Sequence, residues 1–385
     1  MKRTYALFIA FILLLSAGLA GCAQPVQQVS ELMPTAAPTP EPTPEPTPEP
    51  TAEPVVAVPE GRNPLTGLEL DAEHLNRRPV AVMINNIAGA QPQHGLNMAD
   101  QIYEMVAEGG VTRLVAVYQD VSQVPVIGSI RSSRYYYADI AAGLEAVYVH
   151  CGCSGIDSYI DAYNSARMDA MFSSAWNYRD QDRLNTLAYE HTLMTTGAIL
   201  EDYILNSASF SAWHSDGFAP SMTFAEGLTL NGEEAAAVDV DFSSSKRTSF
   251  EYDAQQDKYL VYEIGSAVSS DGSYQYDGND GEILAMTNVV VCVTNTGALR
   301  DSNYFDYLSW GGSASDGRLD YCAAVDVVGS GSGWYFSGGE VVAIQWEKDA
   351  QTAGLSFTDG EGNERLFRPG NTYFCFVGEG QCSFA

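Results

Sequence analysis

Residues 128–134, Gly-Ser-Ile-Arg-Ser-Ser-Arg, combine two arginines and three serines immediately before a stretch that can form a helix, 135–142. The N-terminus of a helix offers unpaired backbone N–H groups and a dipole that favours an anion, and Ser132 or Ser133 is a natural N-cap there. Arginine adds a planar group that can hold a carboxylate or a phosphate with two hydrogen bonds. We therefore expect an anion-binding site. Its predicted ligand-binding residues are Arg113, Ser129, Arg131, Ser132, Ser133 and Arg134.

Two carboxylates and one histidine are the candidates for acid–base catalysis. Glu104 and Glu108 are four residues apart, so both face the same side of a helix expected at 98–107, and Arg113 follows on the next strand. Such a pair could act as general acid and base, or it could form structural ion pairs with arginines. His150 ends an expected strand and could transfer protons or belong to the core. The sequence does not decide between these alternatives, so the catalytic residues are unknown.

Six cysteines follow Cys22, and an even number in an exported protein is typical of disulfides. Cys375 and Cys382 flank an expected hairpin turn. Cys292 and Cys322 lie in two β-like runs. These two pairs are the disulfide candidates.

Motifs for metals and cofactors are missing from the sequence. Cys151 and Cys153 are too close for an unstrained disulfide, and no second ligand pair stands at a metal-binding spacing from them. A nucleophile elbow, a phosphate-binding loop, a dinucleotide fingerprint and a His-Glu-X-X-His pattern are all absent from the sequence. We therefore expect neither a metal nor a cofactor.

The N-terminus has the features of a bacterial lipoprotein signal. Lys2 and Arg3 precede an apolar run that is too short to span a membrane comfortably, and residues 19–22 read Leu-Ala-Gly-Cys. This sequence looks like a lipobox, so we expect residues 1–21 to be a signal peptide and Cys22 to carry lipid, palmitate included. An ordinary secretory signal is the alternative. Lipid chains would hold the protein on the outer face of the cytoplasmic membrane.

Composition limits what the rest of the chain can bind. Residues 22–60 are rich in proline, glutamate and threonine, which predicts a disordered, extended tether. The net charge of −30 argues against nucleic acid as a partner and against electrostatic docking on anionic lipid. Between 61 and 200 every cationic side chain other than histidine is an arginine. This bias suggests guanidinium groups that pair with internal carboxylates or with a ligand.

Strand-like and helix-like patterns divide the folded part into two predicted domains. From 61 to 222, apolar runs at 78–85, 111–118 and 146–151 alternate with helical patterns, which predicts an α/β arrangement. From 223 to 385, short β-like runs separated by Gly, Asp and Ser turns predict a mainly antiparallel β part. The expected fold class is therefore α+β. The expected helices are 98–107, 135–142, 156–166 and 196–206.

Long motifs occur at both ends of the folded part. They include PVAVMINN at 79–86, QPQHGL at 91–96, GSIRSSR at 128–134, HCGCS at 150–154, GSGSGWYF at 329–336 and RPGNTY at 368–373. Together they resemble the YerB-like lipoprotein family, domain of unknown function 3048. The resemblance implies a Gram-positive lipoprotein with an α+β fold, in which a sheet packs on another sheet and on helices, and it implies no established activity. The family tends to have Pro-His-Asn where this chain has Tyr189-Glu190-His191, so a histidine-centred site is not carried over.

These observations predict a lipid-anchored extracytoplasmic protein that binds an anionic cell-envelope ligand, such as a wall glycopolymer or its precursor, in a cleft lined by arginine. Two alternatives stay open: a hydrolase or transferase that acts on a cell-wall glycan or its precursor, and an envelope assembly or scaffold protein. An enzyme should show a carboxylate or imidazole open to water beside the arginines. An interaction module should show fully paired arginines and an exposed apolar patch. The sequence identifies neither a protein partner nor an oligomeric state.

Overall fold

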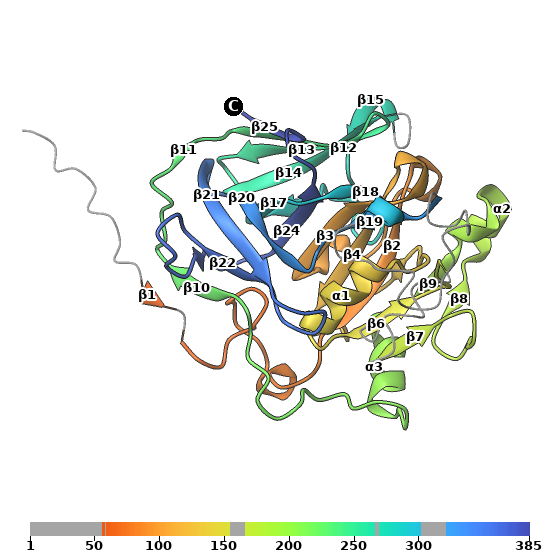
Figure 1. Cartoon of the computed structure of the whole chain (residues 1–385). Coiled ribbons are helices and arrows are strands. Elements are labelled where there is room, and N and C mark those ends of the chain that lie inside the picture. Colours follow the sequence, from red (N-terminus) through yellow and green to blue (C-terminus); the bar gives the residue numbers. More distant parts are fainter. Residues whose placement is uncertain (1–55, 58, 155–165, 266–268, 302–320) are drawn as a thin grey trace, which may run out of the picture. The chain divides into compact units, whose positions relative to one another are not determined.

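A sheet of eleven strands forms the centre of the described part of the chain (Figure 1). The computed structural model describes residues 56–57, 59–154, 166–265, 269–301 and 321–385. The strands follow one another in the order β11-β21-β20-β17-β24-β3-β4-β2-β6-β7, and β22 pairs with β21. In chain order they are β2 (Val80–Asn86), β3 (Gln101–Val106), β4 (Thr112–Tyr118), β6 (Val147–His150), β7 (Arg167–Asp169), β11 (Glu233–Glu234), β17 (Asn288–Val293), β20 (Gly329–Ser337), β21 (Glu340–Lys348), β22 (Ser356–Thr358) and β24 (Thr372–Val377).

The central strands are rich in apolar residues because both faces of the large sheet are covered. β4 reads Thr-Arg-Leu-Val-Ala-Val-Tyr, and all seven residues are buried. β2 is buried along its whole length as well. A strand covered on one face alternates buried and exposed residues, whereas a strand covered on both faces does not. The absence of alternation in β2 and β4 therefore reflects their central position.

A six-stranded sheet covers one face of the large sheet. It consists of β12 (Ala237–Ser243), β13 (Lys246–Asp253), β14 (Lys258–Gly265), β15 (Ser269–Tyr274), β16 (Ala285–Met286) and β25 (Cys382–Phe384). Along β12 the buried positions are Val238, Val240 and Phe242, the period of two expected for a strand with one covered face. Phe250 of β13 packs edge-on against Tyr373 of β24, with ring centroids 5.0 Å apart. The two sheets share one apolar core.

Helix α1 (Tyr135–Gly143) covers part of the opposite face. Its first three residues are tyrosines, and all three are buried. The Tyr136 hydroxyl donates to the carbonyl oxygen of Val106 (2.7 Å), and the Tyr137 hydroxyl lies 2.6 Å from the carbonyl oxygen of Arg113. These bonds satisfy polar atoms that would otherwise be buried without partners, so they fix the helix on the ends of β3 and β4.

Smaller elements surround the large sheet. Two three-stranded sheets are β1 (Val56–Ala57) with β10 (Thr223–Glu226) and β23 (Leu366–Phe367), and β5 (Ile127–Gly128) with β9 (Leu193–Thr195) and β8 (Tyr178–Arg179). A two-stranded sheet joins β18 (Thr296–Ala298) to β19 (Ala323–Val325). The remaining α-helices of the described residues are α2 (Gln181–Thr186) and α3 (Gly197–Leu205). The 3₁₀ turns used below are η1 (Ala72–His74), η4 (Glu108–Gly110) and η7 (Tyr189–His191).

The described residues are mostly strand with few helices, which agrees with the predicted α+β class only in outline. The helices expected at 135–142 and 196–206 are confirmed, whereas the helix expected at 98–107 is wrong because β3 occupies that segment. The helix expected at 156–166 lies almost wholly outside the described residues. β24 of the second predicted domain lies between β17 and β3, so both predicted domains contribute to the same sheet. The boundary at residue 222 stays a prediction.

Neither predicted disulfide is present among the described residues, because Cys292, Cys375 and Cys382 are free thiols. The hairpin expected between Cys375 and Cys382 is wrong. β24 pairs with β17 and β3 in the large sheet, whereas β25 pairs with β12 in the other sheet. Cys292 is fully buried in β17, and Cys322 precedes β19 in a separate two-stranded sheet. Cys22 lies outside the described residues.

Candidate functional site

The arginine-containing segment 128–134 lies beside the carboxyl end of β2. The backbone N–H of Asn85 donates to Ser129 O (3.0 Å), and the N–H of Arg131 donates to Met83 O (2.9 Å). On the other side, Cys151 N donates to Arg131 O at 2.9 Å. The segment is therefore held between the end of β2 and the residues that follow β6, as an extra strand would be.

Two of the predicted arginines have partners within the described residues, and Glu108 contacts both of them. Arg134 Nε donates to Glu108 Oε1 (2.6 Å), and Arg134 Nη2 contacts the other oxygen of Glu108. Arg113 Nη1 donates to the carbonyl oxygen of Ser132 (2.6 Å), with Nη2 4.0 Å from Glu108 Oε2. Burial would raise the pKa of Glu108, but the hydrogen bonds and charge of Arg134, and then the charge of Arg113, bring it below its usual value. Arg113, Arg134 and Glu108 therefore form a structural ion-pair group.

The serines do not surround a helix N-terminus, so the predicted N-cap is wrong. The N-cap of α1 is Arg134, in an extended conformation and with no capping hydrogen bond from its side chain. Ser133 is fully buried, and its hydroxyl accepts a hydrogen bond from Tyr148 (2.9 Å). Ser129 is also fully buried, and its hydroxyl has no hydrogen-bond partner among the described residues. Ser132 supplies the carbonyl that receives Arg113.

Arg131 differs from the other two arginines. It is partly buried, and its side chain makes no hydrogen bond or ion pair with any residue that the structure describes. Burial raises the pKa of Cys151 and lowers that of His191, and a backbone hydrogen bond lowers the pKa of Glu190. The charge of Arg131 makes a smaller, lowering contribution to all three pKa values, so these groups lie near it. Arg131 is therefore a guanidinium group that is still available to an anion.

His191 ends the turn η7 and is 7% exposed. Its Nδ1 lies 2.8 Å from Asn85 Nδ2; because the amide donates, the ring proton is on Nε2. Burial is the first cause that lowers the pKa of His191, Glu190 opposes it, and the charges of Arg131 and Arg183 lower it further. The imidazole is therefore neutral at pH 7. Its Nε2–H has no hydrogen bond to a described residue.

Two further arginines frame this histidine. Arg179 stacks over the ring of Tyr189 (3.9 Å to the centroid) and donates to its carbonyl oxygen (2.6 Å). Arg183 donates to Ala90 O (3.1 Å) and to the carbonyl of His191 (3.2 Å), which ties the loop after β2 to η7. We call Asn85, Arg131, Cys151, Arg179 and His191 the Arg131–His191 site.

The sequence reasoning missed Asn85, Arg179 and His191. The available signal was the exclusive use of arginine between 61 and 200, together with the charged stretch around Arg179 and Arg183. Burial raises the pKa of Cys151 although Arg179 and then Arg131 oppose it, so this thiol is not an activated nucleophile.

The three catalytic candidates do not lie in an open cleft. Glu104 is completely buried: its Oε1 accepts from Thr112 (2.6 Å), and its Oε2 accepts from Thr248 (2.7 Å) and Tyr373 (2.8 Å). Glu104 and Glu108 do not share a helix face, because Glu104 is in β3 and Glu108 is in η4.

His150 is fully buried beside Asp169. Burial lowers its pKa to about 4, although Asp169 opposes this effect. The ring nitrogen Nδ1 lies 3.0 Å from the carbonyl oxygen of Gly152. We therefore describe His150 as a neutral, buried histidine of the strand end.

The two domain models of one protein family match most of the chain. A family model described as "Protein of unknown function (DUF3048) N-terminal domain" matches residues 65–210, and the corresponding C-terminal domain matches residues 238–374. The chain belongs to this family, which confirms the resemblance predicted from the motifs. It is 28% identical over 320 residues to the putative lipoprotein YerB of Bacillus subtilis (strain 168), and this match covers 82% of the chain and 85% of the relative.

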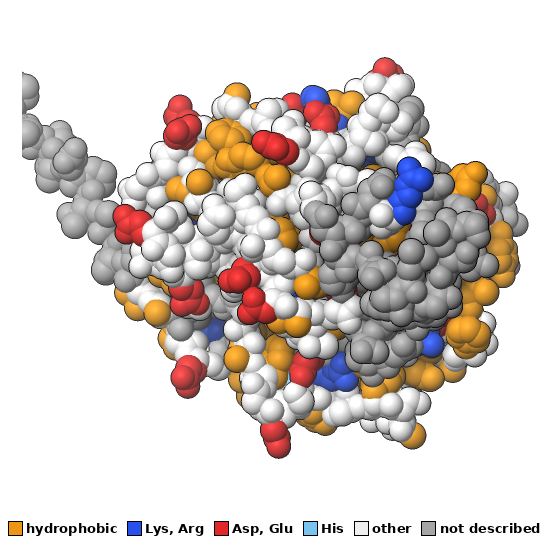
Figure 2. All heavy atoms as spheres, in the orientation of Figure 1, with side chains coloured by type: hydrophobic (Ala, Val, Ile, Leu, Met, Phe, Trp, Pro, Cys, Tyr) orange, Lys and Arg blue, Asp and Glu red, His pale blue; other side chains and the backbone are white. Residues whose placement is uncertain are grey.

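A solved structure shows a related fold. The crystal structure of the YerB protein from Bacillus subtilis superposes with a TM-score of 0.66 at 23% sequence identity, covering 84% of this chain and 99% of the solved chain. No helix among the described residues is long and apolar enough to cross a membrane. On the face drawn in Figure 2, acidic side chains are scattered among polar and apolar ones.

Proposed function

We propose that the chain is a lipid-anchored extracytoplasmic protein that binds an anionic cell-envelope ligand at the Arg131–His191 site. The observation that carries this proposal is the guanidinium of Arg131, which has no partner among the described residues although Arg113 and Arg134 beside it are paired. Although the chain has a net charge of −30, the Arg131 guanidinium forms no ion pair with a carboxylate of the described residues. An anionic ligand would supply the missing partner.

The chemistry of the site favours a phosphate or carboxylate attached to a ring. Arg131 can hold the anion through its planar fork, and the Nε2–H of His191 can donate a further hydrogen bond. The ring of Tyr189 lies beneath Arg179, and this residue is 65% exposed. Exposed aromatic rings suit the apolar faces of sugars. A phosphorylated or uronic wall polymer, or its precursor, fits this combination.

The two alternative functions receive less support. Of the three residues named as candidates for acid–base catalysis, Glu104 and His150 are fully buried and Glu108 is paired with Arg134, which weakens the case for an enzyme built on them. A scaffold would need its arginines fully paired, which is not the case for Arg131. The outer face of the cytoplasmic membrane remains our proposed location, by analogy with the putative lipoprotein YerB.

Replacing Arg131 by alanine is expected to weaken binding of a glycerol-phosphate oligomer about 10- to 100-fold, because a hydrogen bond to a charged group contributes about 1.5–3 kcal/mol. The thermal unfolding midpoint should stay the same, since the side chain has no internal partner. Binding is measured by calorimetry on the full chain, in parallel with a polyuronate. Arg62→Ala, at a surface pair with Glu69, is the matched control and should bind normally. Equal affinities of wild type and Arg131→Ala for both probes would refute the proposal.

Replacing Cys22 by serine is expected to abolish lipid attachment, because a thiol is the acceptor of the diacylglycerol group. Growth with an acyl probe should label the wild-type chain and leave the variant unlabelled. Cys153→Ser removes an exposed thiol of the folded part and should keep the label. Label retained on Cys22→Ser would show that the anchor lies elsewhere.

A further inference from the structure

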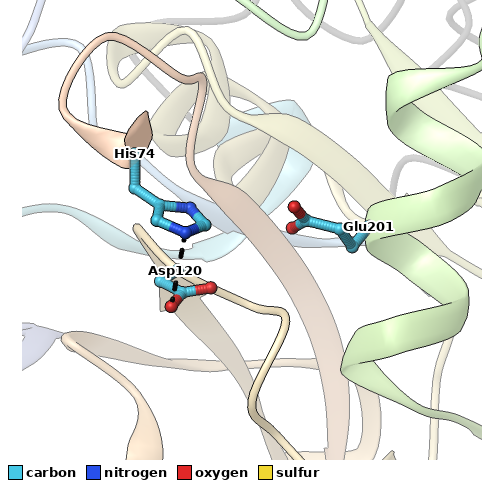
Figure 3. A group of neighbouring side chains, drawn as sticks. All are labelled: His74, Asp120 and Glu201. Atoms are coloured by element: carbon cyan, nitrogen blue, oxygen red, sulfur yellow. Dashed lines mark ion pairs between the residues drawn. The ribbon is translucent and has the colours of Figure 1, made fainter. Parts of the chain in front are cut away.

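His74, Asp120 and Glu201 come from three separate elements and point toward one another (Figure 3). His74 ends η1, Asp120 follows β4 by two residues, and Glu201 lies in α3. One possible ligand atom from each residue lies within 4.8 Å of the other two. We propose that these three side chains bind one divalent transition-metal ion, with Zn²⁺ as the expected occupant. This site is separate from the Arg131–His191 site.

The imidazole of His74 is the strongest indication. The residue is 4% exposed, and neither ring nitrogen forms a hydrogen bond with a described residue; Nδ1 is buried without a partner. Nε2 instead lies 3.7 Å from Asp120 Oδ2. This separation is too long for a hydrogen bond. Metal–ligand bonds of about 2.0–2.2 Å in a tetrahedral site place two ligand atoms roughly 3.4 Å apart. The distance between His74 Nε2 and Asp120 Oδ2 is close to this value, so the two atoms could bind one ion.

The charges around the imidazole also favour a cation. Asp120, Glu201 and Glu73 contribute three carboxylates, and Glu73 Oε1 lies 3.4 Å from His74 Nε2. The cation among them is Arg77, which pairs with Oε1 of Glu201. Oε2 of Glu201 has no partner among the described residues. Arg77 can therefore orient the carboxylate from outside while Oε2 serves as a ligand, an arrangement common in metal sites.

The fold brings η1, the segment after β4 and α3 close enough together for their side chains to share one ion. A Cβ at Gly197 of α3 would lie 1.7 Å from the carbonyl oxygen of Val121, so glycine is needed for the helix to approach the segment that carries Asp120. Asp120 also lines a surface cavity of about 680 Å³ together with Asp71 and Glu69. The cavity gives an ion a route from solvent and leaves room for a coordinated water. One imidazole with two carboxylates suits zinc better than calcium, which prefers six or more oxygens.

Metal binding by the full chain, extracted in detergent and stripped with a chelator, tests the proposal. We expect the stripped chain to bind one Zn²⁺ at the His74–Asp120–Glu201 group. The zinc-loaded chain should unfold at a higher temperature than the stripped chain. Free thiols such as Cys153 also bind zinc, so Co²⁺ is used as a spectroscopic probe. Ligation by His74 and carboxylates gives weak visible bands without the intense thiolate charge-transfer band. A chain that binds Co²⁺ only with the thiolate band would overturn the proposal.

Substitutions of the ligands separate this site from adventitious binding. Asp120→Asn and Glu201→Gln keep the shape of each side chain, and each should lower the affinity at least about tenfold. Glu69→Gln, in the same cavity but outside the three-residue group, should leave the affinity unchanged. If both ligand variants bind Co²⁺ as tightly as wild type and Glu69→Gln, the proposal is wrong.

Discussion

Replacement of Lys246 by methionine is expected to lower the free energy of unfolding by about 3–5 kcal/mol, the typical loss when one partner of a buried ion group is removed. Lys246 Nζ lies 2.7 Å from Glu263 Oε1 and 3.3 Å from Glu104 Oε1, and all three side chains are completely buried. Asn86 Nδ2 completes the group at 2.8 and 3.0 Å from the same two oxygens. Without the ammonium group, two carboxylates would face each other with no cation between them.

Urea denaturation of the full chain measures this loss. Lys258→Met, at a partly exposed lysine of β14, is the matched control and should change stability by less than about 0.5 kcal/mol. Adding Glu104→Gln and Glu263→Gln to Lys246→Met should recover part of the loss, because no unpaired charge then remains. A loss below about 1 kcal/mol for Lys246→Met would show that water reaches the group.

The ion group of Lys246, Glu104 and Glu263 makes the free energy of unfolding depend on pH. Burial would lower the pKa of Lys246, but Glu104 and then Glu263 raise it above its usual value of 10.5. Its folded-state pKa therefore exceeds its unfolded-state pKa. The stabilisation from Lys246 is fully present below pH 10.5 and is lost only as pH rises through the folded-state value.

Replacement of Arg134 by alanine is expected to lower the free energy of unfolding by about 3 kcal/mol, because Glu108 would lose its main partner in a partly buried position. Arg131→Ala, three residues away, should cost far less because Arg131 has no internal partner. Chemical denaturation of the two variants side by side measures the difference. A double-mutant cycle with Glu108→Gln isolates the pairwise energy. Equal losses for the two arginine variants would contradict the assignment.

The stabilisation by the Arg134–Glu108 pair depends on pH in the opposite direction. The pKa of Glu108 is below its usual value of 4.5, so its folded-state pKa is lower than its unfolded-state pKa. The stabilisation is present above pH 4.5 and is lost as pH falls through the folded-state value.

Much of the strand content could be predicted from local pattern, but β3 could not. Its residues are buried on both faces, so they lack the alternation that distinguishes a strand from a helix. Glu104 and Glu108 are polar and four residues apart, a spacing that fits one face of a helix. The burial of Glu104 is possible only because Lys246, far away in the sequence, reaches it from the other sheet. No local pattern contains that information.

Only part of the candidate site was predictable from the sequence, because some of its residues meet through contacts between distant segments. The segment that contains Arg131 was recognisable from its composition, whereas Asn85 and His191 complete the site through a contact between a strand end and a distant turn. The structure also separates Arg131 from Arg113 and Arg134, which the sequence had grouped with it. Pairing with Glu108 decides which arginine is available, and spacing alone does not show it.

The position of β24 between β17 and β3 has a consequence for biogenesis. β24 pairs with β3 from Gln101 to Met105, and Thr372–Val377 is synthesised long after β3. Until it arrives, β3 and β17 each have an unpaired edge, and such edges promote aggregation. The large sheet therefore cannot close before Thr372–Val377 has been synthesised, and its completion depends on a contact of very high sequence separation, which is slow to form. A chaperone that shields strand edges would act most usefully in this interval.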